Sequence, residues 1–283
     1  MSCGLTRADR EEVSYVELVL FTEPVASSRN TTVVPQVSGM AERSRWQDLP
    51  VDRTAYAVAI YALSAGILLG FGLDLAYYLA ERPQLASLHA HAALAVVWLA
   101  LVNSQVALVQ GRYMRLHRQL GWATAVVSVF MVPMAAWAAV SDAARALRAG
   151  HHGTAVLAFE LCEILSFALF TSLGLWLRRD RAVHRRLMTL AVLAVSGAGL
   201  GRVWFMSTSF RIHSPAGVWL ELNVGGALLA LALMGYELAR HRRIHPALLA
   251  GLVWLFGSQA VATIAYGSSG WVALVERSLV LWQ

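Results

Sequence analysis

Seven apolar stretches follow one another along the chain after residue 50, separated by short polar loops. They cover approximately 54–80, 87–110, 120–141, 153–177, 187–207, 216–236 and 246–266. Each is long enough to cross a hydrocarbon core of roughly 30 Å, which takes about 20 helical residues. The stretches are apolar on every side rather than alternating, and a backbone in lipid must satisfy its own hydrogen bonds, so they favour helices over strands. The pattern predicts an all-α integral membrane bundle of about seven transmembrane helices.

The same pattern divides the chain into three segments. Residues 1–50 are expected to be a disordered N-terminal tail, because the run SSRNTTVVPQVSG is polar and has no packed face. Residues 51–266 make up the transmembrane domain. Residues 267–283 contain well-spaced apolar side chains and are expected to form a short external amphipathic tail.

Arginine placement predicts the orientation of this bundle. The loops on one side, together with Arg43, Arg45 and Arg53 just before or at the start of the first span, carry 14 arginines, whereas the loops on the other side carry four. The arginine-rich side is cytoplasmic by the positive-inside rule, which puts the N-terminus inside and the C-terminus outside. The lipid bilayer is then the first partner, and a multi-pass protein of a bacterial inner (plasma) membrane is the expected location.

Composition agrees with the membrane assignment and excludes several kinds of chemistry. The chain is 58% hydrophobic and 14% charged, against about 25% charged in a soluble domain. All 23 basic residues are arginines, so a retinal Schiff base or any other lysine-dependent mechanism is excluded. Two cysteines are too few for a disulfide scaffold or a Cys-rich zinc site. Because the arginines follow topology, we expect no nucleic-acid binding.

Two of the arginine-rich loops resemble each other. LVQGRYMRLHRQLGW (108–122) and LWLRRDRAVHRRLMT (175–189) align at an offset of 67, which pairs His117 with His184 and Arg118 with Arg185. The loops could simply anchor helix ends in the headgroups. Alternatively, the two imidazoles could ligate one haem b iron while the arginines pair with its propionates. Binding of an acidic lipid or a quinone headgroup is a third possibility.

Ionisable residues also fall inside the predicted spans, all near the end opposite the arginine-rich loops. This outer polar cluster consists of Asp74, His89, His91, Glu160, Glu163, Arg202 and Glu221. Such residues are costly in a membrane and are a functional hypothesis by default. In the simplest interpretation Arg202 pairs with one glutamate, and water at the interface hydrates Asp74, His89, His91 and Glu221. In the alternative, the cluster is a proton relay, or it binds a divalent metal through a histidine and the glutamates.

The glycines of SGAGLGR (196–202) lie within the fifth predicted span. No strand precedes them, so they do not form a nucleotide-binding loop. Small residues let helices approach closely in lipid, and we expect close helix packing here.

The chain resembles a family of uncharacterised bacterial polytopic membrane proteins. The resemblance runs from Leu88 to Trp271 through LHAHAALAVVWLALVNSQ, GRYMRLHRQLGW, FELCEILSF, VHRRLMTLA, HRRIHP and GSQAVATIAYGSSGW. It implies no activity. More loosely, HRQLG and HRRLM are similar to the helix starts of cytochrome oxidase assembly proteins and of b-type cytochromes. That similarity implies histidine ligation of haem.

Three functions follow as hypotheses. The first is a membrane redox or redox-assembly protein that binds haem b or a quinone and works with other membrane redox proteins. The second is a proton-coupled transporter or a metal or polar-ligand protein that uses the outer polar cluster. The third is a structural membrane scaffold, and the sequence does not decide whether the protein is an enzyme.

Overall fold

The computed structural model describes residues 50–81, 86–150, 152–207 and 214–280. These residues contain helices and loops but no strand, as the all-α prediction required. The disordered tail expected at the N-terminus lies outside the described residues, apart from Pro50.

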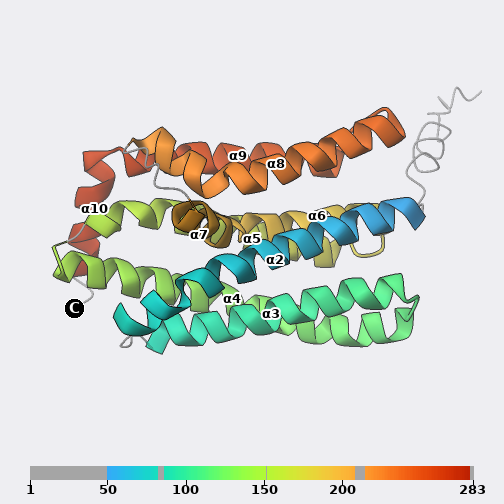
Figure 1. Ribbon diagram of the computed structural model, residues 1–283, viewed down its shortest axis with the longest axis horizontal. Helices are drawn as coiled ribbons and strands as arrows, with labels where there is room; N and C mark the ends of the chain where they lie inside the picture. The colour runs from blue at the N-terminus through green and yellow to red at the C-terminus, as the bar shows by residue number, and fades with distance from the viewer. Residues whose placement is uncertain (1–49, 82–85, 151, 208–213, 281–283) are drawn as a thin grey trace, which may run out of the picture. The chain divides into compact units, whose positions relative to one another are not determined.

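The described helices follow the predicted spans closely (Figure 1). They are α2 (Pro50–Glu81), α3 (Ala86–Gln110), α4 (Met114–Arg148), the 3-10 turn η1 (His152–Val156), α5 (Leu157–Trp176), α6 (Arg181–Ala194), α7 (Gly197–Ser207), α8 (Pro215–His241), α9 (Pro246–Tyr266) and α10 (Ser269–Val280). Six stretches of the described chain are long and apolar enough to cross a membrane, and a seventh is formed if the bent pair α6 and α7 counts as one span.

The bent pair corrects one expectation. The sequence predicted a single helix over 187–207, but the helix ends at Ala194 and restarts at Gly197, with a bend of 48°. Ser196 explains the interruption, because both its backbone N–H and its hydroxyl donate to the carbonyl of Leu193, at 3.2 and 2.7 Å. A serine that bonds backward in this way competes with the helical hydrogen-bond ladder. We call residues Val195 and Ser196 the break.

Several helices begin at residues suited to their first turn. Asp180 accepts hydrogen bonds from the backbone of Ala182 and Val183 at the start of α6. Ser214 accepts from Gly217 at the start of α8, and a proline follows it at the first helical position. These side chains satisfy backbone donors that a helix start leaves unpaired.

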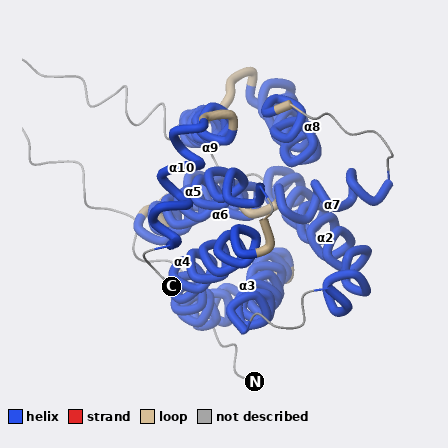
Figure 2. The backbone as a smooth tube through the Cα atoms, turned by 90° about the vertical axis from the view of Figure 1, so that its left-hand side faces the viewer, coloured by secondary structure: helices blue, strands red, loops and turns tan. Residues whose placement is uncertain are grey.

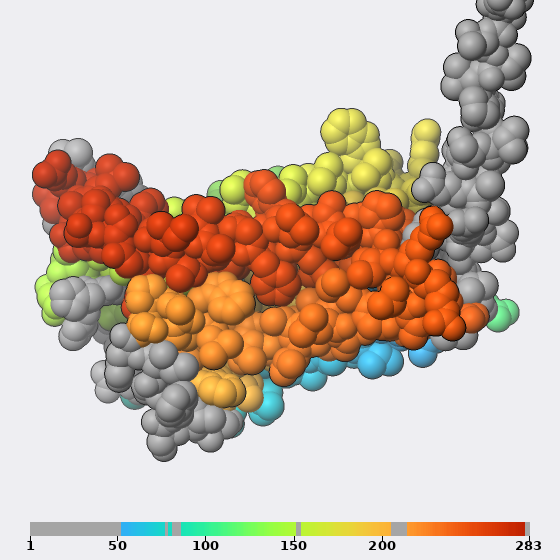
Figure 3. All heavy atoms as spheres, turned by 90° about the horizontal axis from the view of Figure 1, so that it is seen from above, coloured from blue at the N-terminus to red at the C-terminus, as the bar shows by residue number. Residues whose placement is uncertain are grey.

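The helices pack in three tiers. Figure 1 shows α8 and α9 at the top, α2 with α5, α6 and α7 in the middle, and α3 with α4 at the bottom, and the end-on view agrees (Figure 2). Trp98 of α3 meets Phe167 of α5 edge to face at 4.9 Å in the core. Seen from above, α8 and α9 lie side by side over one face (Figure 3). Large apolar side chains point outward, among them Val129 and Ile264. A surface this apolar suits lipid.

The glycines of the fifth span do pack closely, as expected. A side chain on Gly199 would lie 2.6 Å from Cα of Ile67 in α2, and one on Gly70 would collide with the carbonyl of Gly199. The backbones of α2 and α7 therefore touch, because Gly70 and Gly199 carry no side chain to hold the helices apart. This contact brings Arg202, one turn further along α7, beside the end of α2.

Candidate functional site

Polar side chains gather at two places near opposite ends of α2. Asp52 and Asp74 mark the two places and are 22 residues apart, roughly 33 Å along a helix. The first group lies beside the arginine-rich loops, and we call it the Glu237 network. It comprises Asp52, Tyr56, Arg185, Arg186, Tyr236, Glu237, His241 and His245. The second is the acidic cluster of Asp74, Glu160, Glu163 and Arg202.

Glu237 is the centre of the first group. Its side chain is fully buried, and its Oε1 accepts from the hydroxyl of Tyr56 and from Nε of Arg186, the latter at 2.6 Å. Its Oε2 accepts from the backbone N–H of His245 at 2.6 Å. The Arg186 guanidinium also lies over the Tyr56 ring, 5.3 Å from its centroid, and donates to the carbonyl of Ala182. Glu237 thus joins α2, α6, α8 and the start of α9 through charge-assisted hydrogen bonds.

Asp52 organises the rest of the network. Its Oδ1 accepts from the Tyr236 hydroxyl at 2.8 Å and contacts Nε2 of His241 at 3.0 Å. Its Oδ2 lies 3.9 Å from the guanidinium of Arg185, which also covers the Tyr56 ring. One hypothesis from the sequence paired Arg185 with a haem propionate, and in the described structure its guanidinium lies beside Asp52.

His245 titrates away from its usual range. It lies between α8 and α9, and its Nδ1 accepts from the backbone of Ala247. Burial, followed by the nearby Arg186 charge, lowers the pKa of His245 to about 4. The imidazole is therefore neutral in the folded protein at pH 7.

Acid should weaken the fold through this group. Because the pKa of His245 is lower in the folded state than the roughly 6.5 of an unfolded histidine, its contribution to stability is complete above pH 6.5. That contribution falls as the pH drops from 6.5 toward 4, by about 2–3 kcal/mol. In unfolding measurements across this range, His245→Asn should flatten the pH dependence and His89→Asn should not. Equal slopes for the parent and His245→Asn would contradict this assignment.

The two histidines of the repeated loops occupy equivalent positions. His117 is the fourth residue of α4 and His184 the fourth of α6, and each donates its backbone N–H to the residue before its helix. The two imidazoles are close enough for the charge of one to act on the other. The repeat therefore reflects two similar helix starts that lie near each other.

Their imidazoles are oriented differently. Nδ1 of His184 donates to the carbonyl of Gly174 at 2.7 Å, which leaves Nε2 with its lone pair. In the orientation that satisfies its neighbours, the Gln105 amide donates to Nδ1 of His117 and accepts from Gly121. Neutral His117 then carries its proton on Nε2. Of these two histidines, only His184 has its Nε2 lone pair available to a metal or haem iron. Arg118 is exposed and donates to the carbonyl of Met114.

Arg202 pairs with Asp74 in the acidic cluster. Its Nε lies 3.0 Å from Oδ2 of Asp74, and its guanidinium stacks on the Phe71 ring at 4.4 Å. It also donates to the carbonyl of Ala198. The simplest sequence interpretation gave Arg202 a glutamate partner, and the observed partner is an aspartate because the glycine contact brings α7 against α2.

Glu163 lies against the start of α7. Its Oε1 occupies the space that a side chain on Gly197 would need. Glu163 is close enough to Glu160 and Arg202 for their charges to act on it. A carboxylate at a helix N-terminus is also favoured by the helix dipole. The break therefore gives Glu163 its position.

The remaining residues of the predicted cluster are spread out. His89 is exposed, and His91 is half-buried with an Nδ1 that has no hydrogen-bond partner. Among the described residues, no hydrogen bond or ion pair joins either histidine to Asp74, Glu163 or Arg202. Glu221 is buried on α8, which packs on α7. Within the described chain, no group of three or more His, Cys, Asp and Glu side chains is arranged to hold a metal ion.

A double-mutant cycle tests the observed pairing. Arg202→Leu should destabilise the protein and Asp74→Asn should reverse part of the loss, with a coupling energy of about 1 kcal/mol for this half-exposed pair. Glu163→Gln should couple to Arg202→Leu more weakly, since those two side chains are not in contact. Unfolding in mixed micelles would measure both cycles. Stronger coupling to Glu163 than to Asp74 would contradict the pairing.

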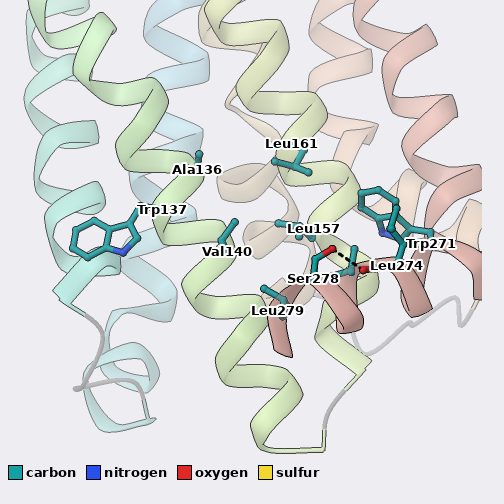
Figure 4. Close-up of a pocket in the computed structure, with 10 residues that line it drawn as sticks. Ala136, Trp137, Val140, Leu157, Leu161, Trp271, Leu274, Ser278 and Leu279 are labelled. Atoms are coloured by element: carbon teal, nitrogen blue, oxygen red, sulfur yellow. Dashed lines mark hydrogen bonds between the residues drawn. The ribbon is translucent and has the colours of Figure 1, made fainter. Parts of the chain in front are cut away.

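A separate groove of about 550 Å³ opens between α4, α5 and α10. It is apolar, as Figure 4 shows, with Val140, Leu157, Leu161 and Leu274 among the side chains around it. The buried Val275 and Leu279 fix α10 beside α4 and α5. Among the described residues, no ionisable side chain lines this groove, so we do not consider it a candidate active site.

Comparisons with protein-family models, with curated proteins and with solved structures find no match to this chain. Its function is therefore inferred from its own residues. Sequence reasoning missed most of the Glu237 network. One signal was present: Glu237 directly follows the predicted apolar span 216–236, and an acid that a span carries into the membrane needs a buried partner.

Proposed function

We propose that this multi-pass membrane protein is a proton-coupled carrier of a small cationic or polar solute, with the acidic cluster as its binding site. The observation that carries the proposal is the position of Glu163 against Gly197, directly after the break between α6 and α7. Interrupted spans of this kind supply substrate and ion sites in secondary transporters, because the interruption places helix ends inside the bundle.

The charges of the cluster support a proton or cation as ligand. Arg202 is engaged by Asp74, and among the described residues no ion pair joins it to Glu163. The negative charge of Glu160 acts on Glu163 more strongly than the positive charge of Arg202 does. A carboxylate held among apolar helices beside a like charge is a proton-binding group by chemistry, and a cation would relieve the same repulsion.

The Glu237 network supports access from the opposite end. It joins α2, α6, α8 and the start of α9 beside the arginine-rich loops, where Glu237 is fully buried. Access from that end requires these hydrogen bonds to separate. In a carrier that alternates its access, the network is then the closed gate of the state described here.

Solute-driven proton movement tests the proposal. The purified full-length protein is reconstituted in vesicles that contain a pH-sensitive dye, and a panel of small amines, guanidinium compounds and neutral polar solutes is added outside. We expect at least one solute to drive proton flux above that of empty vesicles. A panel that evokes no flux from folded protein would contradict the proposal.

His184 favours a second candidate, a redox or redox-assembly protein that binds haem b or a quinone. Its Nδ1–H···O=C bond is the arrangement that orients a ligating imidazole. His117 does not fit as the second ligand in the tautomer set by Gln105. The reduced-minus-oxidised visible spectrum separates the candidates: a b-type band abolished by His184→Ala favours the redox function, and a colourless active protein favours the carrier.

A further inference from the structure

We propose that the break between α6 and α7 is a binding site for a sodium ion. The proposal goes beyond the carrier function, because such a site can exist whether or not the protein transports a solute. It rests on a small cavity lined from α6, α7, α8 and α9 and on one buried amide oxygen, Oε1 of Gln259, that lacks a hydrogen-bond partner. The residues that line this cavity include Ala194, Ser196, Gly197, Asn223 and Gln259.

Gln259 supplies the first ligand. Its side chain is 1% exposed, it lines the cavity, and its Oε1 makes no hydrogen bond. A buried amide oxygen without a partner costs about 1–3 kcal/mol. A bound cation or water in the cavity removes that cost.

The end of α6 adds partial negative charge beside the cavity. The helical ladder is interrupted after Leu193, whose carbonyl accepts both hydrogen bonds from Ser196, and the C-terminus of a helix carries a partial negative charge. Asn223 uses its Nδ2 to donate to the carbonyl of Trp219, which leaves its Oδ1 as an acceptor. Asn223 and Gln259 thus each bring an amide oxygen with acceptor capacity to a cavity whose other walls are mostly apolar, and amide oxygens suit a cation.

The small volume of the cavity and the absence of a carboxylate from its lining indicate which kind of cation would bind. Its volume of about 10 Å³ is close to the roughly 10–15 Å³ that one water-sized ligand needs. Its lining contains no carboxylate, whereas calcium and magnesium sites in proteins use carboxylates. A single small monovalent cation fits both properties.

Glu163 supplies the countercharge. Gly197 lines the cavity and is also the residue against which the Glu163 carboxylate packs. The ion would thus lie on one side of this glycine with the carboxylate on the other. Because no side chain separates them, their attraction acts at short range through a medium of low dielectric constant.

Sodium-dependent stability tests the site. The melting temperature of the full-length protein in detergent is measured in sodium chloride and in choline chloride at equal ionic strength, and ²²Na⁺ binding is measured by scintillation proximity. We expect sodium to raise the melting temperature by about 3 °C and ²²Na⁺ to bind. Gln259→Leu, which keeps the volume of the side chain, should abolish both effects. Gln110→Leu makes the same change where Nε2 donates to the carbonyl of Arg53, and it should leave both effects intact.

The alternatives give different results. A cavity that holds only water predicts no difference between sodium and choline and no ²²Na⁺ binding, which would overturn the proposal. Sodium effects that persist in Gln259→Leu would place the ion elsewhere and would also overturn it. None of these results depends on proton flux, so a failed sodium site leaves the carrier proposal to its own test.

Discussion

Glu237→Ala is expected to lower the free energy of unfolding by about 3–5 kcal/mol. The substitution strands the buried Arg186 guanidinium, whose Nε lies 2.6 Å from the lost carboxylate, and it removes the acceptor of the Tyr56 hydroxyl and of the His245 backbone N–H. A buried charge without its partner is among the most costly changes a fold can undergo. Reversible unfolding in mixed micelles would measure the loss.

The matched double substitution separates charge from packing. Arg186→Met with Glu237→Leu removes both charges and keeps most of the volume, so it should recover the part of the loss that comes from the stranded guanidinium. The Tyr56 hydroxyl and the His245 N–H stay without their acceptor, so the recovery should be partial. Glu276→Ala on α10, where the carboxylate is only half-buried, should cost less than about 1 kcal/mol. If Glu237→Ala unfolds within 1 kcal/mol of the parent, Glu237 does not join the helices as described.

Glu163→Gln is expected to reduce solute-driven proton flux in vesicles at least tenfold. Glutamine keeps the size of the side chain and its place against Gly197, but it can neither release nor take up a proton at neutral pH. The loss should come without a large change in stability, because Glu163 forms no ion pair among the described residues.

Glu276→Gln provides the control for this substitution, since it makes the same change outside the acidic cluster. Its flux should equal that of the parent. If Glu163→Gln keeps the full proton flux, Glu163 is not the proton-binding residue. An equal loss in both variants would indicate general damage to the protein.

Hydrophobic pattern alone predicted most of the fold. The spans were read correctly because lipid requires long uninterrupted apolar helices, and the glycines near residue 200 correctly indicated close packing. The break was missed because Val195 and Ser196 are compatible with a span by composition. Only the two hydrogen bonds from Ser196 to the Leu193 carbonyl reveal it.

The candidate site was predictable only in part. The acids and the one arginine inside the spans identified the acidic cluster, but Arg202 pairs with Asp74 rather than with a glutamate. A hydrophobic pattern does not indicate which helices are neighbours, so the partner could not be predicted. From the sequence, Arg186 is one of the loop arginines that set the orientation of the bundle. Its burial against Glu237 of α8 follows from the way α6 packs on α2 and α9, which a sequence pattern does not show. His117 and His184, which the repeated loops align, are each the fourth residue of a helix.

The proton-binding role of Glu163 is tested most directly by infrared difference spectroscopy of the reconstituted protein during a pH titration. A proton site at Glu163 predicts a band from a protonated carboxyl group that appears reversibly on acidification, is absent in Glu163→Gln and is retained in Glu276→Gln. Identical titration spectra for the parent and Glu163→Gln would contradict a proton site at the break.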